Sequence, residues 1–409
     1  MQTTPTSDTV LAPSPETVRL REAVRRFMDA HIYPNERVLA GLEGGHAEAE
    51  ALMRELQARA KAEGLWAPHL PKEAGGLGIG FLGFAYLNEV IGRSLYAPRA
   101  FGSQAPDAGN AEILWQYGTP EQQERWLRPL VAGEVRSCYS MTEPAVSGAD
   151  PTGLETTAVR DGDEWVINGR KWFSSGAIGA AFAIVMAKTD PEAPPHGRFS
   201  MLIVPTDTPG FTIERRVEVW GDPEANHPQV RYEHVRVPAT HLLGPQGAGF
   251  KIAQRRLGPG RIHHCMRCLG MAQRAFDLLC QRALARHAFG GPIADKQAIQ
   301  FWVADLAANI QAARLLTLHA ARKIDLGDEA RTEVSAIKFF VVQVTCDAVD
   351  KAIQVHGALG VTADTPLQAM YKSARTLRIA DGPDEVHRMV VGRNVLRAYR
   401  AGGTWDFSA

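Results

Sequence analysis

Apolar side chains recur at helical spacing in the early part of the chain. ETVRLREAVRRFMDAHIYPNE carries them at positions that include Val24 and Phe27, and AEAEALMRELQARAKAEGLW repeats the pattern up to Gly64, a residue type that favours a helix end. In TPEQQERWLRPLVAGE a Thr precedes a Pro at the first helical position, which is typical of a capped helix start. We predict a helical N-terminal domain over residues 16–136, after a disordered lead-in over residues 1–15 that is rich in Thr, Ser and Pro.

The pattern then changes to short runs of β-branched and aromatic residues between turns. FAIVMAK, FSMLIVPT and VRYEHVRVP are strand-like, and Pro or Gly separates such runs. The dipeptides Asp161-Gly162 and Asn168-Gly169 both predict hairpin turns. These features predict a middle antiparallel β domain over residues 137–245.

Long helical patterns return after GPQGAGF and continue almost to the end of the chain. RLLTLHAARKID and EVSAIKFFVVQVTCDAVDKAIQVHGALG are the longest of them, and Gly357 and Gly360 are expected to end the second. Long helices of this kind favour a bundle, which we place at residues 246–409. The predicted fold class is therefore α+β, in the order helical, β, helical, and no internal repeat is visible.

Composition and charge narrow the function classes. The 409 residues include 45 Lys and Arg and 45 Asp and Glu, so the net charge is zero. A protein that binds nucleic acid or a membrane surface usually carries an excess of basic residues, so neither partner is expected. The first residues show no secretory signal and no run of apolar residues is long enough to span a membrane, so we expect a cytoplasmic protein.

Five cysteines are scattered along the chain, and their odd count gives no disulfide framework, which suits a reducing compartment. Cys265 and Cys268 form a C-x-x-C beside His263 and His264. A structural zinc site needs four ligands, and the chain has no second C-x-x-C. The segment also has a helical pattern, so we predict no metal.

A short glycine motif is set aside for lack of context. GIGFLG, at residues 78–83, matches G-x-G-x-x-G, but a dinucleotide site needs a preceding strand and an acid about 20 residues later. The residues at that distance are Pro98 and Arg99. We predict a Gly-rich surface loop, and no nucleophile elbow, phosphate-binding Walker loop or H-E-x-x-H motif occurs.

Several segments in order carry a more specific signal. They are YSMTEP, INGRKWFSSGA, RHAFGGPIADKQAIQ, IQVHGALG and RIADGPDEVHR. Together they resemble the acyl-CoA dehydrogenase family over roughly residues 16–400, and ADGPDEVH is most similar to the subfamily of members ten and eleven. The resemblance implies FAD as the cofactor, an acyl-CoA substrate, an electron-transfer flavoprotein as the electron acceptor, and a fold in agreement with the pattern above.

That chemistry requires a flavin, a thioester held between flavin and base, and a polarised carbonyl. The resemblance implies that the flavin ring is contacted by Tyr139, the Met141 backbone and the Thr142 hydroxyl in YSMTEP. In KWFSS, Phe173 stands where the family commonly has a Trp near the flavin, and Ser175 stands for a Thr near N5. Without the resemblance, these residues would be a buried strand, core packing and a surface hydroxyl.

The FAD pyrophosphate calls for a cation, and Arg286 matches the family's R-x-x-F-G with Phe289 beside it. In the family these residues reach FAD from the neighbouring subunit, which implies a homodimer or homotetramer. Ala288 stands where several members have Thr or Gln, so that side-chain contact is lost. Further residues in matching stretches near FAD are Gln297, Gln354, Gly357, Ala358, Pro383 and Glu385.

The base is assigned within RIADGPDEVH. In the family a Glu followed by Gly-Thr commonly supplies it, and Asp381-Gly382-Pro383 occupies that place. The family's second location for the base matches LGPGRIHH, which has no acid. Asp381 is therefore the implied base, and Asp384 and Glu385 are expected in the first turn of the next helix, where acids favour the helix dipole. Asp is one methylene shorter than Glu, so the backbone or the substrate must shift to compensate.

Other residues are predicted to meet the substrate. Arg261 matches a helix Arg near the base, although a purely structural ion pair is an equal alternative. Ser147 or Gly148, in TEPAVSGAD, would approach CoA, and the extra residue there leaves the register open. Ala380 and Gly382 flank the base, and the small Ala380 predicts a wide pocket that admits long or substituted acyl chains.

The predicted function is FAD-dependent dehydrogenation of an acyl-CoA to the trans-2-enoyl-CoA. The carbonyl would be polarised by the Asp381 backbone N–H and a flavin ribityl hydroxyl, by resemblance. Two alternatives stay open. One is another flavin reaction on this fold, such as nitroalkane oxidation, because nitroalkane oxidase is a family relative with an Asp base. The other is a catalytically silent scaffold or assembly partner.

Overall fold

The computed structural model describes residues 11–405 and divides into two compact units. Among the described residues, unit 1 comprises 11–33, 79–98 and 261–405, and unit 2 comprises 34–78 and 99–260. The predicted lead-in over residues 1–15 lies mostly outside the described residues. The predicted domain borders at 136 and 245 stay a prediction.

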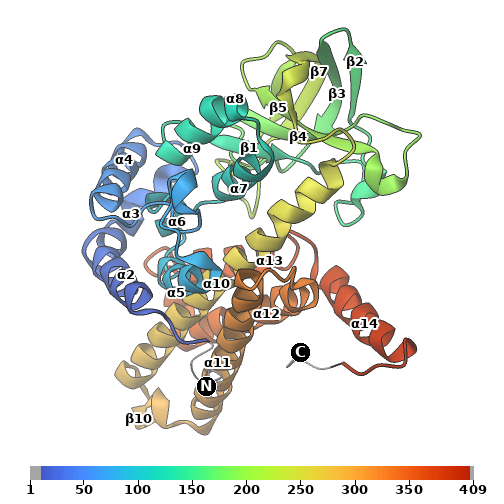
Figure 1. Ribbon diagram of the computed structural model, residues 1–409. Coiled ribbons are helices and arrows are strands. Elements are labelled where there is room, and N and C mark those ends of the chain that lie inside the picture. The colour runs from blue at the N-terminus through green and yellow to red at the C-terminus, as the bar shows by residue number, and fades with distance from the viewer. Residues whose placement is uncertain (1–10, 406–409) are drawn as a thin grey trace. The chain divides into compact units, whose positions relative to one another are not determined.

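Unit 1 is helical (Figure 1). Its main helices are α2 (Pro15–Phe27), α5 (Gly80–Ile91), the part of α10 (Gly249–Ala285) from Arg261 onward, α11 (Gln297–Asp325), α12 (Arg331–His356), α13 (Leu367–Leu377) and α14 (Asp384–Arg400). A small hairpin of β9 (His287–Ala288) and β10 (Gly291–Pro292) follows α10. As predicted, Gly357 ends α12, and its φ of 65° suits a residue without a side chain.

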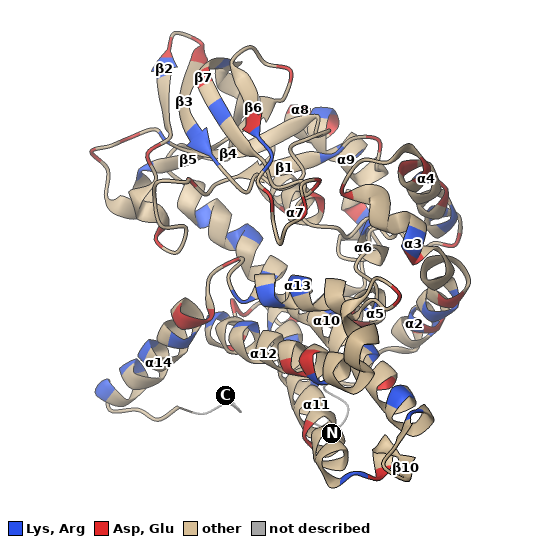
Figure 2. Cartoon of the chain, turned by 180° about the vertical axis from the view of Figure 1, so that it is seen from behind, with Lys and Arg blue, Asp and Glu red and all other residues tan. Residues whose placement is uncertain are grey.

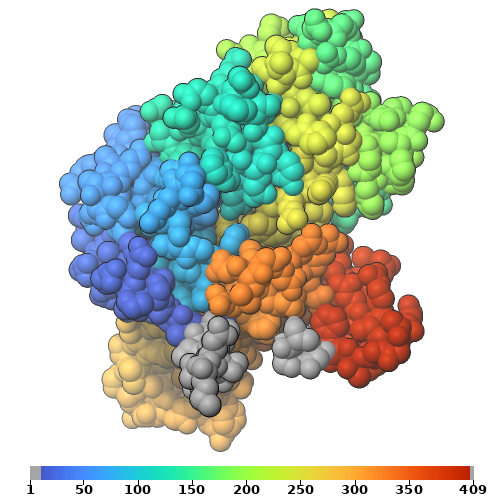
Figure 3. Space-filling model, in the orientation of Figure 1, coloured from blue at the N-terminus to red at the C-terminus, as the bar shows by residue number. Residues whose placement is uncertain are grey.

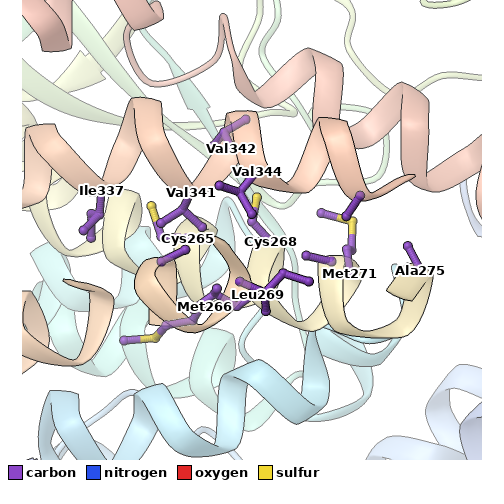
Figure 4. Packing of buried hydrophobic residues seen from close by; sticks show 14 of the residues in the cluster. Cys265, Met266, Cys268, Leu269, Met271, Ala275, Ile337, Val341, Val342 and Val344 are labelled. Carbon is purple, nitrogen blue, oxygen red and sulfur yellow. The ribbon is translucent and has the colours of Figure 1, made fainter. Parts of the chain in front are cut away.

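The core of unit 1 lies between α5, α10, α11, α12 and α13. Figure 4 shows Cys265 and Cys268 on α10 facing Val341 and Val344 on α12. Both thiols are fully buried, and burial raises the pKa of Cys268 to about 12. Across residues 11–405, no group of three or more His, Cys, Asp or Glu is placed to hold a metal ion.

Unit 2 combines helices with a sheet. Its helices are α3 (Glu36–Leu39), α4 (Ala47–Ala62), α7 (Asp107–Tyr117), α8 (Pro120–Gln122) and α9 (Arg128–Ala132), while the four-residue α6 (Ala97–Ala100) crosses the border between the units. The predicted cap at Thr119 is confirmed as a full capping box, in which Thr119 and Gln122 each bond the other's backbone N–H.

The sheet of unit 2 has eight strands in the order β6-β7-β3-β2-β4-β5-β8, with β1 paired to β4. The strands are β1 (Ser137–Ser140), β2 (Thr157–Asp161), β3 (Glu164–Lys171), β4 (Phe182–Lys188), β5 (Phe199–Pro205), β6 (Phe211–Arg215), β7 (Gln229–Pro238) and β8 (Leu242–Leu243). Most pairs are antiparallel, but β4 pairs in parallel with both β1 and β2.

Strands β4 and β5 are buried on both faces, which explains their unbroken apolar sequences. Phe182, Ile184 and Met186 pack against α7 and α9 on one face, whereas Ala183 and Val185 pack against β3 and β7 on the other. The sheet therefore separates two cores within unit 2.

Short 3₁₀ and π turns connect these elements. They are η1 (Met28–Ile32), η2 (Tyr33–Asn35), η3 (Ala40–Leu42), η4 (Lys72–Ala74), η5 (Gln123–Leu127), η6 (Pro151–Gly153), η7 (Pro195–Gly197), η8 (Ala239–His241), η9 (Ile293–Asp295) and η10 (Gly357–Val361). None of the helices described within residues 11–405 is long and apolar enough to cross a membrane.

Two sequence predictions about turns were wrong. Asn168-Gly169 is no hairpin turn: it lies inside β3, where a register shift opposite β7 leaves a bulge, and Asn168 Oδ1 accepts the His234 N–H at 2.8 Å. GIGFLG is not simply a loop, because Gly80 begins α5. Asp325, from the end of α11, accepts the N–H groups of Phe81 and Leu82 at 2.7 and 2.9 Å, and this distant cap is not visible in the local sequence.

Candidate active site

Asp381 lies in the short turn between α13 and α14, in unit 1. Its backbone is left-handed, with φ of 55°, a conformation that Asp adopts more readily than most residues. Its carbonyl oxygen accepts hydrogen bonds from Arg261 Nε at 2.9 Å and from His387 Nε2 at 3.1 Å. Side chains of α10 and α14 therefore fix the backbone of this turn.

The Asp381 carboxylate faces α10. Its Oδ2 lies 3.1 Å from His264 Nε2, and the two side chains are 24% and 16% exposed, so the pair is shielded but reachable. Arg261, the predicted cation beside the base, contacts the Asp381 carbonyl rather than the carboxylate. Burial lowers the pKa of Arg261, and the charge of Asp381 opposes this.

The turn is also held from α12. Lys338 is fully buried and donates from Nζ to the carbonyl of Leu377 at 2.5 Å and to that of Gly382 at 3.4 Å. These bonds fix the last residue of α13 and the residue after Asp381, so the turn is anchored on both sides.

The other two acids of RIADGPDEVH have different surroundings. Asp384 is buried and accepts a hydrogen bond from Arg378 Nε at 2.7 Å, which makes it a structural ion pair. Glu385 is exposed, and both residues lie in the first turn of α14, as predicted. Figure 2 shows the acids at the start of this helix and mostly basic residues along the rest. Among the three acids, Asp381 alone combines a half-buried carboxylate with an anchored turn.

In unit 2, the structure brings together the residues predicted for the flavin ring. The Trp172 N–H donates to the Thr142 carbonyl at 3.0 Å, and the Thr142 hydroxyl donates to the Trp172 carbonyl at 2.8 Å. Tyr139, Met141 and Thr142 therefore lie on a segment beside KWFSS.

Phe173 and Ser175 adjoin a histidine that sequence reasoning missed. Ser175 Oγ lies 2.7 Å from His227 Nδ1, and the rings of Phe173 and His227 are 5.8 Å apart. Phe173 has a φ of 48° and is 38% exposed, an unusual state for an apolar residue. His227 follows an Asn in a polar loop, so its sequence carries no signal of this contact.

A buried ion pair supports the same segment. Lys171 Nζ donates to Glu143 Oε1 at 2.8 Å and to the Met141 carbonyl at 2.7 Å, and Glu143 also accepts the N–H groups of Glu155 and Thr156. Burial opposes ionisation of Glu143, but the Lys171 ammonium and these donors hold the pKa of Glu143 below its ordinary value. The pair thus ties Met141 to β3.

A second cation lies beneath Tyr139. The guanidinium of Arg256, on the unit 2 part of α10, is 3.9 Å from the centre of the Tyr139 ring, and its Nε donates to Asn110 Oδ1 at 2.9 Å. Burial raises the pKa of the nearby Glu112 to about 8, although the charge of Arg256 opposes this.

The raised pKa of Glu112 predicts a pH-dependent stability. The folded chain holds this proton up to about pH 8, whereas the unfolded chain releases it near 4.5, so the free energy of unfolding should fall as pH rises through that window. Glu112→Gln carries no titrating proton, and its stability relative to the natural chain should rise by at most about 1.4 kcal/mol per pH unit. Urea denaturation of both proteins at several pH values tests this, and identical pH profiles would contradict it.

Arg286 and Phe289, which are also predicted to bind FAD, lie far from Asp381 within this chain. Arg286 follows α10 directly, about 36 Å along that helix from Arg261. Phe289, in the same hairpin, has a φ of 51° and is 97% exposed. The segment that carries the hairpin lies at the surface (gold in Figure 3).

Most other predicted contacts lie at exposed loop and helix-end positions. Those at the ends of α11 and α12 are Gln297, Gln354, Gly357 and Ala358, all exposed. Ser147 and Gly148 are exposed in the loop after β1. Ala380, Gly382 and Pro383 flank Asp381 and are half-buried. Several of the predicted residues therefore cluster at the Asp381 turn, at KWFSS or at the hairpin.

Sequence reasoning missed several residues around Asp381. They are His264, Arg267, Lys338 and His387. His264 was considered only as a metal ligand, although its spacing of three from Arg267 places the two on one helix face.

The residues near KWFSS fit a flavin. An exposed Phe ring and the Tyr139 ring can flank a planar apolar ring, and the hydroxyls of Thr142 and Ser175 can bond its polar rim. The buried Glu143–Lys171 pair gives these groups a rigid support.

Family models match almost the whole chain. The N-terminal, middle and C-terminal domains of acyl-CoA dehydrogenase match residues 14–134, 138–235 and 247–396. This chain belongs to the acyl-CoA dehydrogenase family. The predicted family and its fold class are thereby confirmed, as is an oxidoreductase that acts on acyl-CoA with FAD as cofactor.

The names of similar proteins agree with this family assignment. The chain is 46% identical over 397 residues to the Mycobacterium tuberculosis protein named probable acyl-CoA dehydrogenase FadE2, with 94% of this chain and 96% of that protein covered. It is 44% identical to acyl-CoA dehydrogenase family member 11 of Gallus gallus, covering 90% of this chain but 49% of that protein. The chain thus spans about half the length of that relative.

A solved structure shows the same fold. Butyryl-CoA dehydrogenase from Megasphaera elsdenii superposes on this chain with a TM-score of 0.83 at 28% identity, covering 94% of this chain and 99% of that one. The relatives at 40–46% identity include proteins named family members 10 and 11, which confirms the predicted subfamily resemblance.

Proposed function

We propose that this protein oxidises an acyl-CoA thioester to the trans-2-enoyl-CoA, with Asp381 as the base that removes the α-proton. The observation that carries the proposal is the half-buried Asp381 carboxylate, on a turn that α10, α12 and α14 all anchor. A base must be held in place to be effective, and its carboxylate must remain reachable.

The proposed reaction breaks two C–H bonds of the substrate and forms one C=C double bond. The Cα–H bond breaks and its proton passes to the Asp381 carboxylate, while the β-hydrogen leaves with the electron pair of the Cβ–H bond and a Cα=Cβ double bond forms. Bound FAD would supply the acceptor for that β-hydrogen, which would be transferred as a hydride. The Asp381 backbone N–H is the proposed donor to the thioester carbonyl, where negative charge develops.

Cofactor binding is assigned to two groups of residues. Tyr139, Met141, Thr142, Phe173 and Ser175 would hold the flavin ring, and their mutual contacts in unit 2 support this. Arg286 and Phe289 would bind FAD held by another copy of the chain, because the hairpin is exposed and remote from Asp381 along α10. The proposal therefore includes a homodimer or homotetramer, and further FAD contacts from Gln297, Gln354, Gly357, Ala358, Pro383 and Glu385.

Substrate contacts and the electron acceptor belong to the same proposal. Ser147 or Gly148 would meet CoA, and Arg261 would keep a positive charge beside the base. An electron-transfer flavoprotein would reoxidise the flavin.

An acyl-CoA panel tests the function and the pocket width. Anaerobic mixing of the purified yellow protein with acyl-CoAs of increasing length should bleach the flavin absorbance. Long or branched chains should react at least as fast as butyryl-CoA, because Ala380 leaves room beside the base. A sharp preference for butyryl-CoA would overturn the wide pocket, and a flavin that no acyl-CoA bleaches would overturn the function in favour of a silent scaffold.

A further inference from the structure

His264 lies one turn of α10 beyond Arg261 and reaches the Asp381 carboxylate, with Nε2 3.1 Å from Oδ2. On the other side of the ring, Nδ1 lies 2.8 Å from Arg267 Nη2. Both ring nitrogens of His264 are therefore engaged, one by an acid and one by a permanent cation.

The contact with Arg267 fixes the proton on the ring. A guanidinium nitrogen can only donate a hydrogen bond, so Nδ1 must accept and the proton of a neutral imidazole must lie on Nε2. Burial and the charge of Arg267 lower the pKa of His264, although Asp381 opposes this, and the lowered pKa favours the neutral ring. Nε2–H is thus a donor that points to Asp381 Oδ2.

The charged and titratable groups around the pair come from three helices. Arg261 and Arg267 lie on α10, Lys338 on α12, and His387 on α14. Burial, reinforced by Arg261, lowers the pKa of His387 to about 4, so this ring is neutral as well. Arg261, Lys338 and His387 bond backbone carbonyls of the turn, whereas His264 bonds the carboxylate itself.

We propose that His264 is a positioning residue whose Nε2–H holds the Asp381 carboxylate in the orientation that removes the α-proton. The inference rests on the proposed function of Asp381. The backbone bonds set where the turn lies, but rotation about the Asp381 side chain remains, and His264 removes it. A shorter acid needs this help, because an error of about 1 Å in the position of a reacting group costs roughly 10²-fold in rate.

The test separates proton removal from electron transfer. A 3-oxoacyl-CoA has an acidic α-proton and forms an enolate at the base without passing a hydride, so its absorbance reports the base alone. His264→Leu should slow both enolate formation and turnover about 10²-fold, with FAD content unchanged. The acid limb of the pH–rate profile should move to higher pH, because the ionised Asp381 carboxylate loses a hydrogen-bond donor.

A matched pair guards against a folding defect. His264→Gln places an amide N–H near the position of Nε2–H and should recover most of the rate and the original acid limb. His264→Asn carries the same amide on a shorter side chain and should behave like His264→Leu. His263→Phe is the neighbouring control, because His263 packs against Phe81 and Phe84 rather than Asp381, and its acid limb should not move.

Two results would overturn the positioning role, and the first of them leaves the proposed function intact. One is normal enolate formation and an unmoved acid limb in both His264→Leu and His264→Asn, together with an inactive Asp381→Asn. The other is complete inactivity of His264→Gln with FAD bound, which would make His264 itself the proton carrier and would overturn the proposed role of Asp381 as well. An active Asp381→Asn would instead overturn the proposed function, and the positioning role with it.

Discussion

Asp381→Asn should lower the rate of flavin reduction by acyl-CoA by about 10²–10⁴-fold, the range usual for loss of a general base. Asn keeps the size of Asp and also tolerates the left-handed backbone found at this position, so the turn should persist. The variant should still bind FAD, because the proposed ring contacts lie in unit 2. Stopped-flow bleaching of the flavin under anaerobic conditions measures the effect.

Asp350→Asn is the matched control for this variant. It removes one exposed carboxylate from α12, and its rate should equal that of the natural chain. A rate for Asp381→Asn within a few-fold of the natural chain would show that another group takes the proton.

Lys171→Met should lower the free energy of unfolding by about 3–5 kcal/mol, because it leaves the buried Glu143 carboxylate without its cation. Lys171 is fully buried and Glu143 is 4% exposed, so water cannot replace the lost ammonium. The Met141 carbonyl also loses its donor, and we expect weaker FAD binding as a second effect. Urea denaturation followed by tryptophan fluorescence gives the first quantity, and flavin release gives the second.

Two comparisons make the Lys171 result specific. The double variant Lys171→Met with Glu143→Gln removes both charges and should recover part of the loss, since no unpaired charge stays buried. Arg128→Met breaks an exposed pair with Glu124, whose side chains are 76% and 68% exposed, and should cost at most about 1 kcal/mol. Equal losses in the two single variants would contradict the role assigned to burial.

Local signals in the sequence predicted much of the fold. The Thr119 cap and the Gly357 helix end depend on neighbouring residues and were correct. The same reasoning failed at Asn168-Gly169, where pairing with β7 turns a hairpin dipeptide into a bulge, and at GIGFLG, where Asp325 caps a helix from a distant part of the chain. Both local structures depend on contacts between residues more than 60 positions apart in the sequence, and no local pattern contains such contacts.

The candidate site likewise contains one residue that the sequence predicted and several that it did not. Asp381 was selected from RIADGPDEVH by resemblance and by the absence of an acid in LGPGRIHH, and its catalytic role stays a prediction. The groups that hold it were not foreseen. Lys338 lies in no motif, His387 lies at the end of RIADGPDEVH but was given no role, and both act through backbone carbonyls. His227 was equally invisible, since only the folded loop brings it to Ser175.

The packing of α10 against α12 also limits the reaction of two cysteine thiols with oxidants. Cys265 and Cys268 are fully buried and do not contact solvent. Burial also disfavours the thiolate, which is the form of the sulfur that peroxide or an alkylating reagent attacks. Chemical damage at these sulfurs must wait until the two helices separate. The extent to which these two cysteines are modified would therefore depend on how often unit 1 opens rather than on the redox state of the surroundings.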